Sequence, residues 1–252
     1  MAASDAAAAV RLAVNDVRAG YGANLILQGV SLSVRTGETV CLLGANGTGK
    51  STLLKTVLGY VDCRTGTIEM DGERIDHWPV HRRVAAGIRY VPQGHVVFED
   101  MSVRENLLLG AHLNRGQAGE GIARAVELFP QLGAFLNRRA GVLSGGERQM
   151  VSVSRAMMVS PEILVLDEPS AGLSPKYVHL LFEGLGRARD AGITMLLTEQ
   201  NAAKALEFSD RAYVLDRGTM VIEEAARDLR ERESFRASYL DVDALRAEQR
   251  KP

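Results

Sequence analysis

Two patterns of hydrophobic positions recur along the chain, and each predicts a different kind of β-strand. In the stretches 10–14 and 30–34, hydrophobic residues alternate with other residues, as in antiparallel strands that have one exposed face. In the stretches 40–43 and 163–166, hydrophobic residues run without interruption, as in strands of a parallel sheet that are buried on both faces. The chain therefore combines a half-exposed antiparallel part with a buried parallel core.

Shorter signals complete the predicted order of elements. Asp71-Gly72 lies between two strand-like runs and indicates a hairpin, and residues 212–215 and 220–222 predict another one near the C-terminal end. Residues 79–86 favour a short helix, 88–91 a strand that stops at Pro92, and 193–198 another strand. Strands alternating with helices indicate an α/β fold.

A long stretch between the predicted strands has only helical signals. Ser102 and Glu105 have the spacing of a capping box, and Ile122, Val126 and Phe129 recur at helical intervals. No strand-like run appears from Gly94 until Ile163. We therefore expect a helical subdomain at about 94–160 within a domain that spans 10–222. Residues 1–9 are expected to be a disordered tail, and 223–252 a charged helical tail.

The motif G-x-x-x-x-G-K-[ST] follows the first buried strand and precedes a helical pattern, which is the context that a phosphate-binding loop requires. Its glycines let successive N–H groups approach an anion, Lys50 can reach the outer phosphates, and the Ser51 hydroxyl can bind Mg²⁺. The sequence thus predicts a site for a nucleoside triphosphate, with contacts from Gly44, Asn46, Gly47, Gly49, Lys50, Ser51 and Thr52.

Composition and charge narrow the choice of partners. The formal net charge of −1 gives no basic footprint for nucleic acid, and the two cysteines, Cys41 and Cys63, indicate a reduced compartment. No hydrophobic run is long enough to cross a bilayer. We expect a cytoplasmic protein whose role at a membrane depends on partner chains.

Polar residues follow several of the predicted strands at the point where each strand ends. Gln93, the pair Asp167-Glu168 and Gln200 occupy such positions, as does the phosphate-binding loop. The carboxyl ends of parallel strands meet at one edge of a sheet, where α/β proteins bind ligands. We therefore expect these residues to converge on the phosphates.

Each of these side chains has a functional and a structural interpretation. Asp167 suits a Mg²⁺ site beside Ser51, and Glu168 can orient a water molecule and take its proton. Alternatively, Asp167 only caps the following helix. The Gln93 amide oxygen can complete the Mg²⁺ shell, or Gln93 is an ordinary loop residue. Tyr21, between two glycines, can stack on a purine base or simply pack.

A second candidate anion site opens the helix that begins after Leu143. Ser144, Gly145 and Gly146 resemble another phosphate cradle, because glycines at a helix start expose backbone N–H groups. This motif follows the helical stretch and not a sheet strand, so it need not face its own phosphate-binding loop. We expect each loop to be closed by Ser144, Gly145 and Gly146 of a second chain.

From Val10 to about Ile222 the chain resembles the ATPase subunits of ATP-binding-cassette (ABC) transporters. The resemblance is carried by the phosphate-binding loop, the signature Leu143-Ser144-Gly145-Gly146-Glu147 and the strand that ends at Asp167-Glu168, in the family's order. It implies a P-loop NTPase (RecA-like) core with an N-terminal antiparallel β subdomain and a helical insert. It also implies ATP and Mg²⁺ as cofactors, and a head-to-tail homodimer or heterodimer with ATP between the subunits.

The same resemblance assigns roles to single residues. Tyr21 becomes the adenine-stacking aromatic, Gln93 the glutamine that senses Mg²⁺ and the membrane partner, and Glu168 the catalytic carboxylate. Many family members have histidine where this chain has Gln200, and many have an aspartate a few residues after the catalytic acid, where this chain reads Ser170-Ala171-Gly172. Both differences resemble the ATPases of branched-chain amino-acid uptake systems and their urea or amide relatives.

The resulting hypothesis is an importer ATPase that is peripheral on the inner face of the cell membrane. Its partners would be transmembrane permeases and, indirectly, a substrate-binding protein, with no nucleic acid. The alternatives are a non-transport ABC ATPase that acts on nucleic acid or ribosomes, and an importer ATPase for urea or short amides. A further alternative is a pseudo-ATPase that binds ATP and serves as a scaffold, because this chain has Gln200 where many family members have histidine. Catalysis is expected to depend on Lys50, Glu168 and Gln200.

Overall fold

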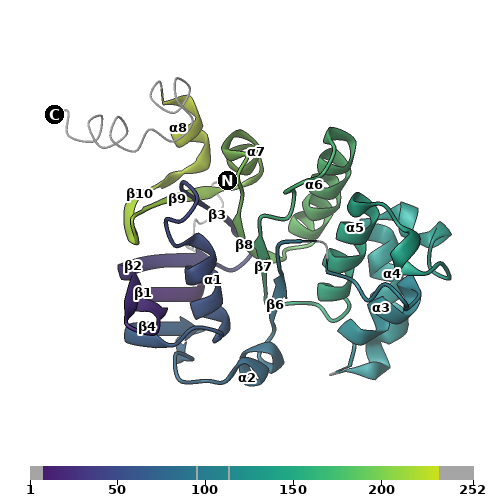
Figure 1. Ribbon diagram of the computed structural model, residues 1–252, viewed down its shortest axis with the longest axis horizontal. Helices are drawn as coiled ribbons and strands as arrows, with labels where there is room; N and C mark the ends of the chain where they lie inside the picture. The colour runs from purple at the N-terminus through teal and green to yellow at the C-terminus, as the bar shows by residue number, and fades with distance from the viewer. Residues whose placement is uncertain (1–7, 95, 113, 233–252) are drawn as a thin grey trace, which may run out of the picture.

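The computed structural model describes residues 8–94, 96–112 and 114–232, which form two sheets and a layer of helices (Figure 1). The predicted α/β class is confirmed by this arrangement. The first sheet has the order β2-β1-β4-β5, and the second has the order β10-β9-β3-β8-β7-β6. The expectations for 1–7 and 233–252 concern residues outside those described.

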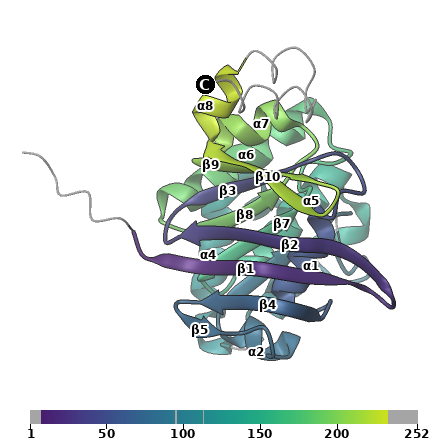
Figure 2. The same ribbon diagram turned by 90° about the vertical axis from the view of Figure 1, so that its left-hand side faces the viewer.

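The first sheet is antiparallel, as the alternating pattern predicts (Figure 2). One face of β1 and β2 is buried and the other is exposed, so hydrophobic residues occupy every second position. The β4–β5 hairpin turns at Asp71 and Gly72, which both have positive φ angles. Its strands are β1 (Val10–Tyr21), β2 (Asn24–Arg35), β4 (Cys63–Met70) and β5 (Glu73–Arg74).

The second sheet is parallel from β9 to β6, and only β10 at its edge runs antiparallel. Its central strands are buried along their whole length because both faces are covered. The strand β10 continues to Ala225, three residues past the predicted boundary at Ile222. The strands are β3 (Thr39–Leu43), β6 (Ile88–Val91), β7 (Ile163–Asp167), β8 (Thr194–Thr198), β9 (Arg211–Asp216) and β10 (Thr219–Ala225).

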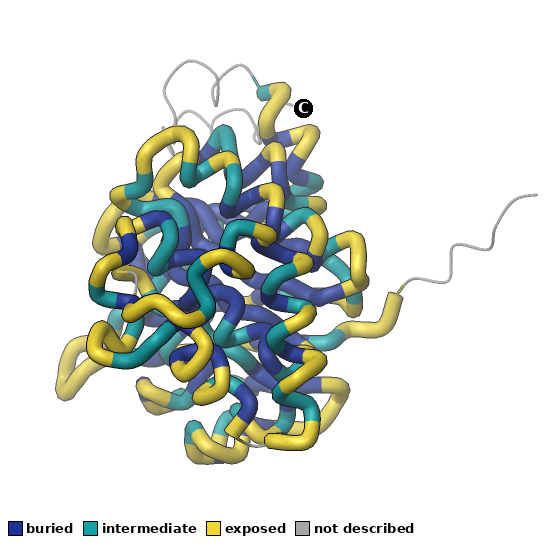
Figure 3. Tube along the Cα trace, turned by 90° about the vertical axis from the view of Figure 1, so that its right-hand side faces the viewer, coloured by how far each residue is buried: buried dark blue, intermediate teal, exposed yellow. Residues whose placement is uncertain are grey.

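Two hydrophobic cores lie on opposite faces of the second sheet, and both are dark blue in Figure 3. In β3, Leu42 faces the core shared with the first sheet, whereas Leu43 faces the core shared with the helical layer. The first core encloses α1 (Lys50–Leu58), whose Leu53, Leu54 and Val57 are fully buried. The phosphate-binding loop and its helix are therefore held between two sheets.

Between β6 and β7 the regular elements among the described residues are helices and 3₁₀ turns, and the one β-bridge joins Ser102 and Arg139. The predicted capping box of Ser102 and Glu105 is present, and so is a second one formed by Ser144 and Glu147. The helices are α3 (Val103–Gly110), α4 (Ala118–Leu128) and α5 (Gly145–Ala156), with 3₁₀ turns η1 (Arg115–Gln117), η2 (Pro130–Ala134) and η3 (Ala140–Val142).

The remaining helices are α2 (Val80–Ala85), α6 (Pro175–Asp190), α7 (Ala202–Phe208) and α8 (Ala226–Glu231). Of these, α6, α7 and α8 contribute to the same core as the helical layer, and α2 packs beside β6 (Figure 1). Among the residues that the structure describes, no helix is both long and apolar enough to cross a membrane.

Candidate active site

The phosphate-binding loop joins β3 to α1 in a conformation that depends on its glycines. Gly44 has φ of 154°, and a Cβ atom there would lie 2.4 Å from the Leu215 carbonyl oxygen. The turn after β9 also reaches the loop, because the Gly218 N–H donates to the Thr48 carbonyl at 3.0 Å. Close backbone packing against the β9–β10 hairpin thus leaves no room for a Cβ atom at Gly44.

Lys50, the first residue of α1, is 5% exposed and folds back over its own loop. Its Nζ atom donates to the carbonyl oxygens of Gly44 at 2.8 Å and Ala45 at 3.2 Å. Burial lowers the pKa of Lys50, and the nearby carboxylates of Glu168 and Asp167 oppose that effect. The ammonium group is thus placed at the loop where phosphates would enter.

Asp167 ends β7 and is 4% exposed, and hydroxyl groups surround its carboxylate. The Ser51 hydroxyl donates to Oδ1 at 3.1 Å, and the Thr198 hydroxyl donates to the same atom at 2.8 Å. The Tyr90 hydroxyl donates to Oδ2 at 3.3 Å. The helix-cap interpretation of Asp167 is wrong, because α6 begins only at Pro175 and its N-cap is Ser174.

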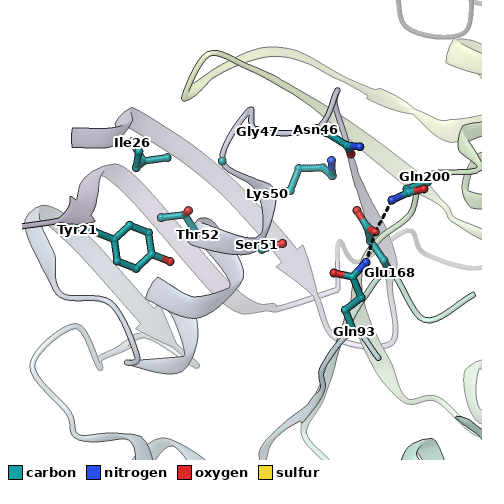
Figure 4. Close-up of a pocket in the computed structure, with 11 residues that line it drawn as sticks. Tyr21, Ile26, Asn46, Gly47, Lys50, Ser51, Thr52, Gln93, Glu168 and Gln200 are labelled. Carbon is teal, nitrogen blue, oxygen red and sulfur yellow. Dashed lines mark hydrogen bonds between the residues drawn. The ribbon is translucent and has the colours of Figure 1, made fainter. Parts of the chain in front are cut away.

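Glu168 lies directly beside Asp167 and has a positive φ of 46°, in the left-handed region. Its Oε2 atom accepts hydrogen bonds from two amide groups, Gln93 Nε2 at 2.9 Å and Gln200 Nε2 at 2.7 Å (Figure 4). These amides follow β6 and β8, the strands on either side of β7. The expected convergence of strand-end residues thus brings Gln93, Glu168 and Gln200 into contact.

Gln200 lies between β8 and α7, where a polar side chain often caps the following helix. The N-cap of α7 is the next residue, Asn201, whose Oδ1 atom accepts from the Lys204 N–H at 3.0 Å. Gln200 does not cap the helix, and its amide points at Glu168 (Figure 4).

A pocket of about 410 Å³ connects these groups, with Tyr21 at one end and Glu168 at the other (Figure 4). Tyr21 ends β1, is 49% exposed and lines the pocket, so its ring is accessible to a flat ligand. Arg64 holds the turn after it by donating to the Gly22 carbonyl at 2.5 Å. The pocket is lined by Tyr21, Ile26, Asn46, Gly47, Gly49, Lys50, Ser51, Thr52, Gln93, Glu168 and Gln200.

Ser144, Gly145 and Gly146 do not line this pocket. Ser144 and Gly145 are exposed at the start of α5, where the Ser144 hydroxyl accepts from the Glu147 N–H at 3.4 Å. Gly146 is buried, and a Cβ atom there would lie 2.1 Å from the Tyr177 ring. The motif therefore lies outside the pocket at the chain's own phosphate-binding loop.

The donor set at the loop is compatible with a hard cation. Within the described ranges, no cluster of three or more histidine, cysteine, aspartate or glutamate side chains could hold a metal ion unaided. Ser51 and Asp167, which are hydrogen-bonded at 3.1 Å, and Gln93 carry hydroxyl, carboxylate and amide oxygens, which are donor types that Mg²⁺ accepts alongside phosphates and water.

Several residues of this site were not predicted from the sequence. Thr198 and Tyr90 contact Asp167, and Ile26 lines the pocket. Glu199 is 2% exposed and accepts the Ser170 N–H at 2.9 Å; burial raises its pKa. Thr198 and Glu199 lie at the end of a predicted strand, which could have marked them as candidates. An apolar run, however, does not indicate which of the residues at its end contact the site.

The chain is similar to proteins of one family along most of its length. The model of the ABC transporter family matches residues 27–171. The Pseudomonas aeruginosa "High-affinity branched-chain amino acid transport ATP-binding protein BraG" is 40% identical over 230 residues, covering 91% of this chain and 99% of that protein. The Archaeoglobus fulgidus "Probable branched-chain amino acid transport ATP-binding protein LivF" is 39% identical over 221 residues, covering 87% of this chain and 94% of that protein.

The fold has similar solved structures as well. A crystal structure of a nucleotide-free ATP-binding cassette from an ABC transporter superposes with a TM-score of 0.79 at 26% identity, covering 92% of this chain and 99% of that one. The phosphate-binding loop, the acids that end β7 and the signature before α5 occur here in one fold. This chain belongs to the ABC transporter family and is an ATPase coupled to transport.

Proposed function

We propose that this chain is the ATP-hydrolysing subunit of an importer for branched-chain or other hydrophobic amino acids. The observation that carries the catalytic part is that Lys50 and Glu168 line one pocket, while Asp167 accepts a hydrogen bond from the pocket residue Ser51 at 3.1 Å. The amino-acid part is supported by the names of the relatives that are 40% and 39% identical. Lys50 would bind the outer phosphates, and Tyr21 would stack on the adenine.

Glu168 is the proposed general base for the attacking water. Its carboxylate can accept the water's proton, and the amides of Gln93 and Gln200 hold it in place. Because Gln93 uses its nitrogen on Glu168, its amide oxygen is available to a cation. Gln200 is the proposed sensor of the γ-phosphate, since its N–H₂ group lies at the catalytic end of the pocket.

Ser51, Asp167 and Gln93 are the residues proposed to hold Mg²⁺ beside the phosphates. When bound, the ion would neutralise charge that builds up on the phosphate oxygens. The hydroxyl groups around Asp167 keep its carboxylate oriented toward the loop.

The working unit is proposed to be a head-to-tail dimer, either homomeric or with a related ATPase. The exposed start of α5 lies outside the chain's own pocket, so it is free to close the pocket of a second chain. ATP would then join the two chains, and hydrolysis would separate them. This cycle would move separate permease subunits, which receive cargo from a substrate-binding protein.

Exposed hydrophobic residues support a permease contact close to Gln93. Val96 is 46% exposed and Phe98 52% exposed, in the loop that Gln93 begins. Leu108 and Leu109 of α3 line a neighbouring groove of about 380 Å³. We propose that a cytoplasmic segment of the permease occupies this groove, which places the protein at the inner face of the membrane.

Uptake by cells tests the proposed function. In a strain that lacks this gene, we expect uptake of labelled leucine, isoleucine and valine to fall and the parent gene to restore it. Lys50→Ala should fail to restore uptake, because it removes the cation for the outer phosphates. Lys55→Ala, on the same helix but outside the pocket, is the matched control. Loss of urea uptake instead would reject the amino-acid assignment and leave the ATPase assignment intact.

A further inference from the structure

We propose that Thr198 is a positioning residue that orients both acidic residues of the site at once; this inference rests on the proposed function. The Thr198 side chain is 0% exposed at the end of β8. Its hydroxyl donates to Asp167 Oδ1 at 2.8 Å and accepts the Glu168 N–H at 3.0 Å. A single hydroxyl group thus links the proposed metal ligand to the backbone of the proposed base.

The sheet register brings Thr198 to this place. Asp167 and Thr198 are paired directly across the parallel strands β7 and β8. The three residues before Thr198 in β8 are hydrophobic and fully buried, so this strand is apolar until Thr198 meets Asp167 at its end. A buried hydroxyl without partners is costly, and here it is satisfied both as a donor and as an acceptor.

Thr198 and Tyr90 together fix the orientation of the Asp167 carboxylate. Thr198 donates to Oδ1, and Tyr90 donates to Oδ2 at 3.3 Å, so each carboxylate oxygen has its own anchor. Ser51 also donates to Oδ1 at 3.1 Å, but it is proposed to turn its oxygen toward Mg²⁺. Thr198 is then the donor that continues to hold Oδ1.

The same hydroxyl stabilises an unfavourable backbone conformation at Glu168. The Glu168 N–H is shared between the Thr198 carbonyl oxygen at 3.1 Å and the Thr198 hydroxyl at 3.0 Å. A positive φ at a residue other than glycine persists only when surrounding contacts hold it. This conformation presents the Glu168 side chain to Gln93 and Gln200, so loss of the hydroxyl affects the base as well as the metal site.

The test compares side chains of similar size with and without the hydroxyl. Thr198→Val should lower turnover by roughly tenfold or more. It should also raise, severalfold, the Mg²⁺ concentration that gives half-maximal binding of a non-hydrolysable ATP analogue. Thr198→Ser keeps the hydroxyl and should restore both quantities to within about twofold of the parent.

Thr194 provides a matched control on the same strand. It is 2% exposed, and its hydroxyl accepts the Gly37 N–H at 3.0 Å at the other end of β8. Thr194→Val therefore also removes a buried hydroxyl, but it should leave the Mg²⁺ requirement for binding unchanged. Thermal unfolding of each variant separates loss of stability from loss of positioning.

Specific results would overturn the inference. If Thr198→Val binds the analogue with the parent's Mg²⁺ requirement, Thr198 does not position Asp167. An equal shift in Thr194→Val would reduce the effect to general stability. If Thr198→Val does not fold, Thr198→Ala supplies a smaller side chain without the hydroxyl, with the same two outcomes. If the parent chain hydrolyses no ATP but Thr198→Val still shifts the Mg²⁺ requirement, the proposed function fails and the positioning role stands.

Discussion

Glu168 combines a reactive side chain with a backbone conformation that most residues avoid. Its φ of 46° lies in the left-handed region, which costs about 1–3 kcal/mol for such a residue. Hydrogen bonds on both sides offset that cost, because Thr198 accepts its N–H and the Ala171 N–H donates to its carbonyl oxygen at 3.1 Å. The result is a carboxylate aimed into the pocket, 8% exposed and held by two amides.

Replacing Glu168 with glutamine tests whether this carboxylate is the base. Glu168→Gln keeps the size of the side chain and removes the proton acceptor, so turnover should fall by roughly a hundredfold or more while ATP still binds. The variant should accumulate as an ATP-bound dimer on size exclusion. Glu183→Gln, on the exposed face of α6, is the control and should behave like the parent. Parent-like hydrolysis in Glu168→Gln would show that another group takes the proton.

Gln200 should affect the reaction more than it affects binding. Gln200→Ala removes the proposed contact with the γ-phosphate, which is expected chiefly in the ATP-bound dimer. Turnover should therefore fall by about tenfold with little change in ATP affinity. Gln200→His should keep substantial activity and make turnover depend on pH near the ordinary histidine pKa of about 6.5. Steady-state assays across pH measure both effects. Full activity in Gln200→Ala would exclude a sensor role.

At the scale of elements, α1 carries Lys50 and Ser51, and a side chain from another element binds its C-terminal end. Its N-cap is Gly49, in the left-handed conformation. Near its C-terminus the Arg83 guanidinium, from α2, donates to the carbonyl oxygens of Thr56 at 2.8 Å and Val57 at 2.7 Å. Carbonyls in the last turn of a helix lack the usual N–H donor four residues further on. Arg83 supplies a donor to both carbonyls, and the Thr56 carbonyl also accepts the Gly59 N–H at 3.1 Å.

Arg83 should therefore contribute strongly to stability, although it lies far from any acid–base chemistry. It is 2% exposed and also donates to the carbonyl oxygens of Trp78 at 3.0 Å and Asp76 at 2.9 Å. Arg83→Met removes all of these donors from buried acceptors, and we expect a loss of about 3 kcal/mol in the free energy of unfolding. Denaturant unfolding measures the loss.

The neighbouring residue provides the control for this prediction. Arg82 is exposed, lies over the Trp78 ring and has an ion pair with Glu73 at 3.5 Å. Arg82→Met should change stability much less than Arg83→Met. Equal losses in the two variants would show that the carbonyl contacts of Arg83 are not the cause.

At the scale of the whole molecule, the phosphate-binding loop and the Ser144 motif lie in different places. The pocket sits at the end of the parallel strands, whereas α5 belongs to the helical layer (Figure 1). The site therefore has one exposed side that its own chain does not cover. A second chain placed head-to-tail would cover both sites symmetrically.

This geometry predicts how activity depends on protein concentration. Without nucleotide the purified chain should be mostly monomeric, and its ATPase activity should rise faster than linearly with concentration. Analytical ultracentrifugation with and without ATP, using Glu168→Gln to trap the dimer, measures association directly. A strictly linear dependence from a chain that stays monomeric with ATP would contradict the shared site.

Local patterns in the sequence were sufficient for the elements and for much of the site. The phosphate-binding loop is identified by its spacing, because the glycines, lysine and serine must follow one another in a fixed order between strand and helix. The predicted capping box at Ser102 is also local, since its partner Glu105 lies three residues away. Strand ends placed Gln93, Glu168 and Gln200 near one another because parallel strands share an edge.

Only the tertiary structure decided which side chains touch. That Asn201 and not Gln200 caps α7 follows from backbone angles that two adjacent polar residues do not reveal. Thr198 meets Asp167 because β8 pairs with β7 in one register, although 31 positions separate the two residues. Arg83 looks like part of an exposed basic run until folding buries it against α1. The spacing of neighbouring residues in the sequence determines which helices and strands form. Strand order and register determine which side chains meet, and both depend on how the whole core packs.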